Sequence, residues 1–348
     1  MTVRYAVLDP QDTPLSGRLF QLSPEGTVEN EAVVGYSAEV RFQPHTRELL
    51  VLESEADVAA PMKFFLRLLD SESLQQTARR EIPTRPMYAG FPGRSVAGPI
   101  SPSSRYVYFL RSGPVIQYGD DLAFRLTPAR WDRKLDRIET GEFHVDSCHV
   151  DYGLTGNNED DLFLHLSCEY ASTVAFGSFL SPDCDFLRLE DLQRRQHGPM
   201  ETNGSWLDST RYYLYCVNRN GDIYEVKLRE GTSRVLAHLR IGPNRSVPVH
   251  QIWGAAGQVH VGVADDIGNM GLGRVTEIWS VCAETGEFLG RRLLPCPLMN
   301  FVVTPDGKQF VCADPYSRSV FCLDRESGDQ VWSLKGIGKA PSEILLIG

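Results

Sequence analysis

The sequence lacks any long apolar run and any concentration of basic residues. No stretch approaches the ~20 consecutive apolar residues that a membrane-spanning helix needs. The N-terminal residues also show no signal-peptide pattern, that is, no basic segment followed by an apolar segment. Lys and Arg number 35 against 45 Asp and Glu, a net charge of −10. Nucleic-acid binding depends on clustered positive charge. These absences argue against nucleic-acid and membrane partners, and they predict a cytoplasmic protein.

Paired cysteines and the common catalytic motifs are also missing. The eight cysteines include no C-x-x-C, and five of them lie in apolar β-type runs: Cys168, Cys216, Cys282, Cys312 and Cys322. We expect reduced, buried thiols that pack as small hydrophobic groups, with a disulfide framework as the alternative. No G-x-S-x-G, S-x-x-K or H-E-x-x-H sequence occurs. Any catalysis is therefore expected to rest on proton transfer.

What the sequence does contain is a repeated hairpin. Residues 300–314 (NFVVTPDGKQFVCAD) hold two β-type runs around a D-G turn, whose glycine supplies the positive φ that tight hairpins require. Segments of the same length occur at 39–53, 97–111, 204–218 and 251–265. A longer copy, 149–169, carries six more polar residues in its turn. A hairpin can lengthen there without disturbing its strand pairing.

Two further β-type runs follow each hairpin, so groups of four strands recur every ~45–60 residues. The C-terminal SEILLIG supplies a first strand to one more group, and RYAVLD, RLFQLS and VENEAVV supply the others. Radial repetition of four-stranded sheets is typical of β-propellers, and joining both ends leaves no unpaired edge. We predict an all-β, single-domain chain over 1–348: a seven-bladed β-propeller with four-stranded antiparallel blades and a terminal blade closed by both chain ends. Six or eight blades are the alternatives.

Each blade of a propeller places the start of its first strand beside the end of its second, at the mouth of the central channel. The second-strand ends are Asp9, Glu53, Arg111, Glu169, Asn218, Asp265 and Asp314. The first-strand starts are Glu39, Ala97, His149, Gly204, Gln251, Asn300 and Glu343. The acids either form turns or make an acidic mouth that attracts an amine and raises carboxyl pKa values by mutual repulsion.

From these positions we select candidate site residues. The candidate acid/base residues are His149, Glu169 and Asp265, because imidazole and carboxyl groups transfer protons. The candidate ligand-binding residues are Glu53, Arg111, Asn218, Trp253, Asn300 and Asp314. Arg111 can pair with an acid or hold a ligand carboxylate, and Trp253 either stacks on a ligand or packs between blades. The six-residue insertion lies at the other end of its hairpin, so we expect it to play no part in this pocket.

One stretch carries residue types that bind metals. FHVDSCHVDYG contains His144, Asp146, His149 and Asp151. Alternate residues of a strand face opposite sides, so one strand cannot present all four to one ion. We therefore predict no metal and no other cofactor.

The C-terminal segment SVFCLDRESGDQVWSLKGIGKAPSEILLIG has a strand, D-x-x-S/T-G, a second strand and G-x-x-P before a closing strand, and AETGEFLGRRLLP repeats the middle of this pattern. In these residues the chain resembles the heavy-chain β-propeller family of methylamine and quinohemoprotein amine dehydrogenases. The resemblance implies a chain that helps to form a substrate channel and carries no quinone, which belongs to a separate small subunit in that family.

Three functions remain open. The first is a stand-alone enzyme of specialised metabolism that binds an amine or amino-acid-derived small molecule and condenses or cyclises it by acid/base chemistry. The second is a non-catalytic scaffold or large subunit of an amine-oxidising complex, with a partner subunit or in a homo-oligomer. The third is a lactonase-type hydrolase with a metal in the channel.

Overall fold

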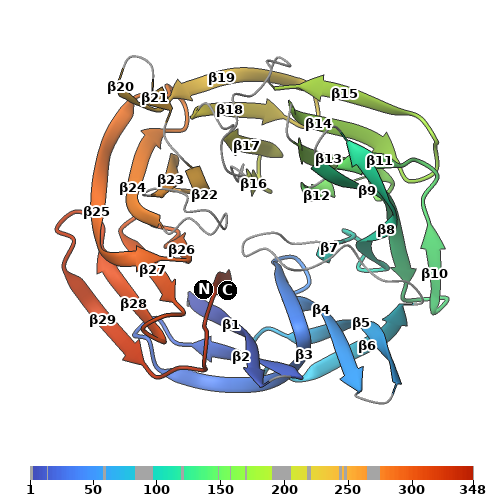
Figure 1. Cartoon of the computed structure of the whole chain (residues 1–348), viewed down its shortest axis with the longest axis horizontal. Coiled ribbons are helices and arrows are strands. Elements are labelled where there is room, and N and C mark those ends of the chain that lie inside the picture. The colour runs from blue at the N-terminus through green and yellow to red at the C-terminus, as the bar shows by residue number, and fades with distance from the viewer. Residues whose placement is uncertain are drawn as a thin grey trace.

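The computed structural model describes residues 3–13, 15–57, 60–82, 97–118, 121–147, 149–156, 158–168, 171–189, 205–217, 221–242, 245–246, 249–264 and 275–347. Within these ranges the regular structure consists of β-strands, and no helix occurs that is long and apolar enough to cross a membrane. The strands form antiparallel sheets that are arranged around a central axis (Figure 1). The predicted all-β class is therefore confirmed.

Both ends of the chain contribute to one sheet, in which the strand order is β30-β1-β2-β3-β4-β5-β6. The strands are β30 (Glu343–Ile347), β1 (Arg4–Thr13), β2 (Ser16–Leu22), β3 (Val28–Gln43), β4 (Glu48–Asp57), β5 (Ala60–Asp70) and β6 (Gln76–Ile82). Strand β30 pairs antiparallel with β1, from Arg4 opposite Ile347 to Leu8 opposite Glu343. The predicted pairing of SEILLIG with RYAVLD is confirmed.

The long strand β3 joins two four-stranded groups. Its residues 28–35 pair with β2, and its residues 36–43 pair with β4. Gly35 lies at the changeover, where an added Cβ would stand 2.4 Å from the carbonyl oxygen of Ser54. Glycine permits this close approach of two backbones. One continuous strand thus contains both VENEAVV and EVRFQ, which the sequence pattern assigns to separate groups.

The other strands form smaller sheets. One sheet contains β7 (Ala97–Ile100), β8 (Tyr106–Tyr118), β9 (Asp121–Asp132), β10 (Arg137–Thr140) and β11 (Val145–Ser147). Four-stranded sheets contain β12 (His149–Leu154), β13 (Asp161–Cys168), β14 (Ala171–Ser178) and β15 (Cys184–Arg188); β16 (Ser205–Asp208), β17 (Tyr213–Val217), β18 (Asp222–Lys227) and β19 (Thr232–His238); β22 (Val249–Ala255), β23 (Gln258–Ala264), β24 (Val275–Cys282) and β25 (Phe288–Leu298); and β26 (Asn300–Val303), β27 (Gln309–Asp314), β28 (Ser319–Asp324) and β29 (Gln330–Lys335). The short strands β20 (Arg240–Gly242) and β21 (Arg245–Ser246) pair with each other. In each four-stranded sheet the strands follow chain order, as consecutive hairpins require.

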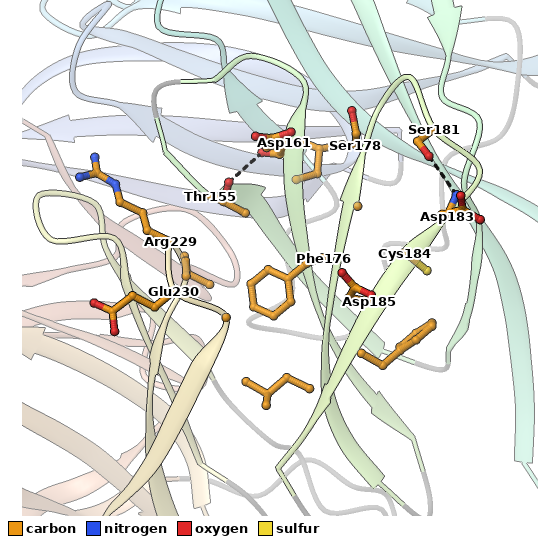
Figure 2. A pocket seen from close by; sticks show the side chains of 16 residues that line it. Thr155, Asp161, Phe176, Ser178, Ser181, Asp183, Cys184, Asp185, Arg229 and Glu230 are labelled. Atoms are coloured by element: carbon orange, nitrogen blue, oxygen red, sulfur yellow. Dashed lines mark hydrogen bonds between the residues drawn. The ribbon is translucent and has the colours of Figure 1, made fainter.

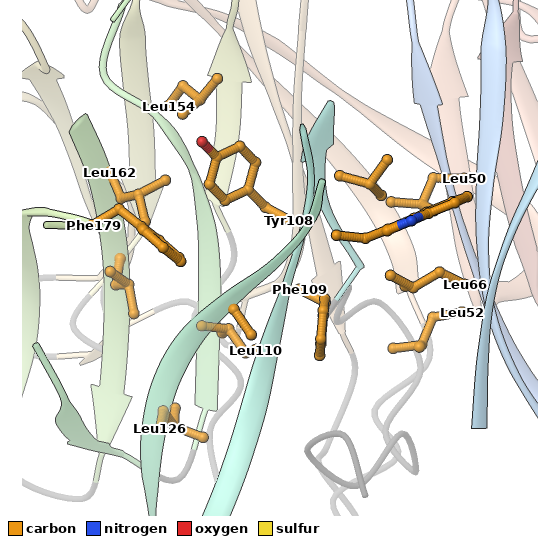
Figure 3. Close-up of a cluster of buried hydrophobic side chains, with 14 of the residues drawn as sticks. Leu50, Leu52, Leu66, Tyr108, Phe109, Leu110, Leu126, Leu154, Leu162 and Phe179 are labelled. Carbon is orange, nitrogen blue, oxygen red and sulfur yellow. The ribbon is translucent and has the colours of Figure 1, made fainter. Parts of the chain in front are cut away.

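The hydrophobic core lies between neighbouring sheets, as strand β8 illustrates. Its residues 107–110 are all buried, although side chains of a strand alternate between two faces. The ring of Tyr108 meets the edge of Phe179 at 6.0 Å, on the side of β12–β14, whereas Phe109 lies on the side of Leu66 in β5 (Figure 3). Both faces of the sheet are covered, which explains why the strands read as continuous apolar runs.

The D-G and S-G-D turns and the thiols of Cys312 and Cys322 behave as predicted, whereas Cys282 is only partly buried and a hydrogen bond with Thr285 lowers the pKa of its thiol. Gly307 in the D-G turn and Gly328 in the S-G-D turn have φ of 70° and 81°. Cys312 and Cys322 are buried in the core clusters around β27 and β28. Burial raises the pKa of both thiols, to about 12 for Cys322. These thiols therefore stay uncharged and pack as small apolar groups.

Candidate functional site

Hairpin register brings the two predicted sets of polar residues together at one end of the sheets. Asn300 pairs with Ala313, and Glu39 pairs with Leu52. In these two hairpins the first-strand residue lies opposite the residue that immediately precedes the acid, whereas Ala97 pairs with Phe109 and His149 with Ser167, one residue earlier in the second strand. In β22 a bulge before Gln251 shifts the register, so the equal lengths of the hairpins do not give equal pairing everywhere.

Several selected residues fall on parts of the chain that are not described. Glu169, Asn218 and Asp265 lie outside the described residues. His149 begins β12 and pairs with Ser167, but its side chain is not described. The proposed acid/base roles of His149, Glu169 and Asp265 therefore stay predictions.

Glu53 is buried and has its partners inside the protein. Its carboxylate accepts a hydrogen bond of 2.7 Å from the backbone N–H of Gly35. The guanidinium groups of Arg67 and Arg79 stand 3.6 and 3.5 Å from its oxygens. These contacts tie β4 to β5 and β6 and support the changeover in β3.

Asp314 and Arg111 also have partners nearby. The carboxylate of Asp314 accepts hydrogen bonds from the backbone N–H groups of Tyr316 and Ser317, at 3.0 and 3.2 Å, and from the Ser317 hydroxyl at 2.6 Å. This is the turn-forming use that the sequence leaves open as an alternative. The guanidinium of Arg111 donates to Oγ1 of Thr140 at 2.6 Å, which links β8 to β10.

Glutamine side chains connect neighbouring inner strands. Gln251 in β22 donates from Nε2 to Oδ1 of the buried Asn300, at 3.2 Å, and its Oε1 accepts the backbone N–H of Phe301 at 3.1 Å. In the same way, Oε1 of Gln43 in β3 accepts the backbone N–H of Ile100 in β7, at 3.0 Å. These bonds hold adjacent sheets together where their strands meet the channel.

The remaining candidates take part in packing or in ion pairs. Trp253 is partly buried and packs against two core clusters. This matches the alternative in which Trp253 packs between blades. In FHVDSCHVDYG the chain changes sheets, because β11 pairs with β9 whereas β12 pairs with β13. Asp146 forms an ion pair of 3.2 Å with Arg125. Among the described residues, no three His, Cys, Asp or Glu side chains are grouped so that they could hold a metal.

Glu343, the first residue of β30, is electrostatically unusual. Burial raises the pKa of its carboxyl to about 7, and the positive charge of Arg41 acts in the opposite direction. Arg41 lies in β3, which is in contact with β30. Arg41 and Glu39 are two residues apart in β3, so their side chains lie on the same side of that strand. Among the described carboxyl groups with shifted pKa values, Glu343 alone has a raised one. A carboxyl of this kind can accept and release protons near neutral pH.

The sequence names Glu343 as a first-strand start but assigns it no role. It also predicts that mutual repulsion of carboxylates raises their pKa values, whereas burial is the main cause at Glu343. Acids that form turns behave differently, since hydrogen-bond donors lower the pKa values of Asp306 and Asp324. A lone acid at the start of the apolar strand EILLI is the sequence signal that could have found this residue.

The loop before β30 is held by Asp9, another residue of the predicted set. The buried carboxylate of Asp9 accepts hydrogen bonds from the backbone N–H groups of Lys339 and Ala340. Gly338 has a φ of 58°, and an added Cβ would stand 2.4 Å from Oδ2 of Asp9. This tight contact sets the position at which β30 and Glu343 begin.

No protein-family model matches the chain, and no curated protein sequence matches it either. Solved structures do match. A putative 6-phosphogluconolactonase from Bacteroides fragilis has a TM-score of 0.60 and 10% identity, over 100% of this chain and 98% of that one. The β-propeller domain of Cps50 (Swd1) from Myceliophteria thermophila has a TM-score of 0.53 and 11% identity, over 86% of each chain. The chain has a β-propeller fold.

A third propeller match is the dihydro-heme d1 dehydrogenase NirN, with a TM-score of 0.55 and 11% identity over 96% of this chain and 63% of that one. At such low identity these likenesses show the fold and leave the function open. The resemblance to amine dehydrogenase heavy chains therefore rests on the quoted C-terminal residues alone.

Proposed function

We propose that the propeller binds an amine or amino-acid-derived small molecule in its central channel, and that Glu343 exchanges a proton with this ligand. The observation that carries the proposal is the carboxyl of Glu343, which lies on an inner strand and has a pKa raised to about 7 by burial. Efficient general acid/base catalysis needs a group whose pKa lies near the working pH.

Glu343 and Arg41 each interact with a different part of such a ligand. The ionised carboxylate of Glu343 pairs with a ligand ammonium group, or takes its proton and leaves a nucleophilic neutral amine. The protonated carboxyl then returns the proton to the leaving oxygen of a condensation or cyclisation. The guanidinium of Arg41 holds a ligand carboxylate through two parallel N–H donors. An enzyme that acts on amino-acid derivatives uses both groups.

We further propose that the propeller has seven blades and shares an ancestor with the amine dehydrogenase heavy chains. In this arrangement β3 serves two blades, as the outer strand of one and the inner strand of the next. The inner strands are then β30, β3, β7, β12, β16, β22 and β26. The C-terminal motif resemblance supports an amine as the ligand class.

The proposal is tested by thermal-shift and calorimetric titration with a panel of primary amines, amino acids and the corresponding carboxamides. We expect amine binding to strengthen as Glu343 ionises, by up to ~10-fold per pH unit below its pKa of about 7. Glu343→Gln is expected to weaken amine binding at least ~10-fold and to abolish this pH dependence. Arg41→Gln is expected to weaken the binding of ligands that carry a carboxylate more than the binding of simple amines.

Glu287→Gln is the matched control, because Glu287 is exposed and lies in the connection between β24 and β25, which are not inner strands of the proposed blades. The control should bind like the wild type. The proposal is contradicted if no amine binds to the wild type, or if Glu343→Gln binds amines as tightly as the wild type does. Either result would leave the scaffold function as the better interpretation of the fold.

A further inference from the structure

A groove of ≈ 590 Å³ lies at the end of the sheets that carries the β12–β13, β14–β15 and β18–β19 turns. One wall is the sheet β12–β15, and the other is the turn at residues 228–231 (Figure 2). Strand β12 begins at His149 on the far end, so the groove is separate from the predicted channel mouth. Its volume is in the range of ordinary ligand sites, ~300–1,000 Å³.

The floor of the groove is apolar. The ring of Phe176 lies in the middle of it, between Asp185 on one side and the Arg229–Glu230 turn on the other (Figure 2). Phe176 and Asp185 pair across β14 and β15, so their side chains lie on the same face. Leu187 and the buried Leu228 extend this floor.

The rim of the groove is acidic. Asp161, Asp183, Asp185 and Glu230 face one cation, Arg229, among the lining residues. Arg229 stacks on the ring of Tyr212, at 4.3 Å from its centroid. The lining therefore has three more negative charges than positive ones. Within the groove, burial and the charges of Asp185 and Asp183 raise the pKa of the Cys184 thiol, in keeping with a negative local potential.

Two features point to an extended peptide as the occupant. Strand β15 is at the edge of its sheet, and no second described strand pairs with it; such an edge offers backbone groups to an added strand. The lengthened β12–β13 turn also reaches the groove through Thr155 and Asp161, whose carboxylate accepts a hydrogen bond of 2.7 Å from Asn158. The lengthened turn thus brings Thr155 and Asp161 to the rim of the groove.

We propose that this groove binds an extended segment of a partner protein in which Lys or Arg residues alternate with apolar side chains. The apolar side chains lie on Phe176 and Leu228, and the basic ones pair with Asp183, Asp185 and Glu230. Such pairs lie at the surface, so they favour association and specificity and are screened by salt.

The test uses a fluorescein-labelled peptide of alternating Lys, Leu and Arg residues, an acidic peptide with Glu and Asp in place of the basic residues, and phenethylamine as a small amine. Fluorescence anisotropy with the full chain should show binding of the basic peptide alone, weakened by added salt. The double variant Asp183→Lys/Asp185→Lys should weaken it at least ~10-fold. Phe176→Ala should weaken it while retaining the salt dependence.

The matched control is Glu326→Lys/Asp329→Lys, which reverses two exposed acids in the corresponding turn between β28 and β29. It should bind the basic peptide as the wild type does, which separates the groove from the overall charge of −10. Equal loss of binding in both double variants would show a non-specific charge effect and overturn the proposal. Competition by phenethylamine, or binding that survives Asp183→Lys/Asp185→Lys in a folded protein, would overturn it as well.

Discussion

Replacement of Glu343 by Gln is expected to change how the stability of the propeller depends on pH. Glutamine has nearly the shape of a protonated glutamate, but it cannot ionise. In the wild type the folded carboxyl has a pKa of about 7, against an ordinary value of 4.5. The folded state therefore binds the proton more tightly than the unfolded state does. The contribution of Glu343 to wild-type stability is therefore complete below about pH 4.5 and is lost as the pH rises through about 7.

The size of this effect follows from the pKa difference. A shift of one unit corresponds to about 1.4 kcal/mol, so a shift from 4.5 to about 7 corresponds to at most about 3–4 kcal/mol. Relative to the wild type, Glu343→Gln should therefore gain up to about 3–4 kcal/mol of stability between pH ~4 and pH ~8. The partial exposure of Glu343 to the channel makes this figure an upper limit.

His260 acts in the opposite direction and would hide this effect in the wild type. It is fully buried in β23, and burial, with a contribution from the charge of Arg325, lowers its pKa from 6.5 to about 3. Its Nδ1 is hydrogen-bonded to the Ser280 hydroxyl at 2.8 Å. Since the unfolded state gains the proton first, the contribution of His260 is complete above pH 6.5 and is lost as the pH falls toward 3.

Between about pH 4.5 and 6.5 the two residues contribute slopes of similar size, roughly 1.4 kcal/mol per pH unit, with opposite signs. Urea unfolding at a series of pH values measures these slopes. Glu343→Gln should lose stability on acidification through this range, and His260→Gln should gain it. Glu287→Gln serves as the control. A pH-independent difference between Glu343→Gln and the wild type would refute the assignment of a raised pKa to Glu343.

Three further predictions concern the joints of the ring. Gly338→Ala should destabilise the protein by about 1–3 kcal/mol more than Gly336→Ala, because both glycines have positive φ but only a Cβ at Gly338 meets Asp9; equal melting temperatures would contradict this. Deletion of residues 342–348 should destabilise strongly, because it removes the strand paired with β1 and the buried Ile344 and Ile347; a truncated protein that melts like the wild type would show that this strand is dispensable. Gln251→Ala should cost about 1–3 kcal/mol in urea unfolding, since the N–H of Phe301 loses its acceptor, and a cost near zero would mean that another group replaces the amide.

The sequence predicts the strands well because each blade is built from consecutive hairpins. Apolar runs, D-G turns and equal spacing are local properties, so residues 300–314 specify their own hairpin almost completely. The continuity of β3 was not predicted, because it depends on the contact of Gly35 with Ser54, which lies on another strand. The bulge before Gln251 could not be predicted from the sequence for the same reason.

Side-chain roles were harder to predict than strand positions. The spacing places Glu53 and Asp314 at equivalent points of two hairpins, yet Glu53 pairs with Arg67 and Arg79, whereas Asp314 binds its own turn. These partners differ because only the Glu53 blade carries arginines at the neighbouring positions of its third and fourth strands. A repeat therefore predicts where a residue lies, and the sequence outside the repeat decides what that residue contacts.

The same reasoning indicates why function in this propeller is expected at sheet ends. Side chains in the middle of the sheets are covered on both faces, so the core there is apolar, and unpaired polar groups are costly in such surroundings. At the channel, Gln43 and Gln251 satisfy backbone groups of adjacent strands, while Glu343 holds a carboxyl whose charge the surroundings disfavour. The ionised Glu343 destabilises the folded state, and it makes no ion pair among the described contacts. A functional role explains such a residue better than a contribution to stability does. Glu343 is therefore the residue at which a ligand should first be sought.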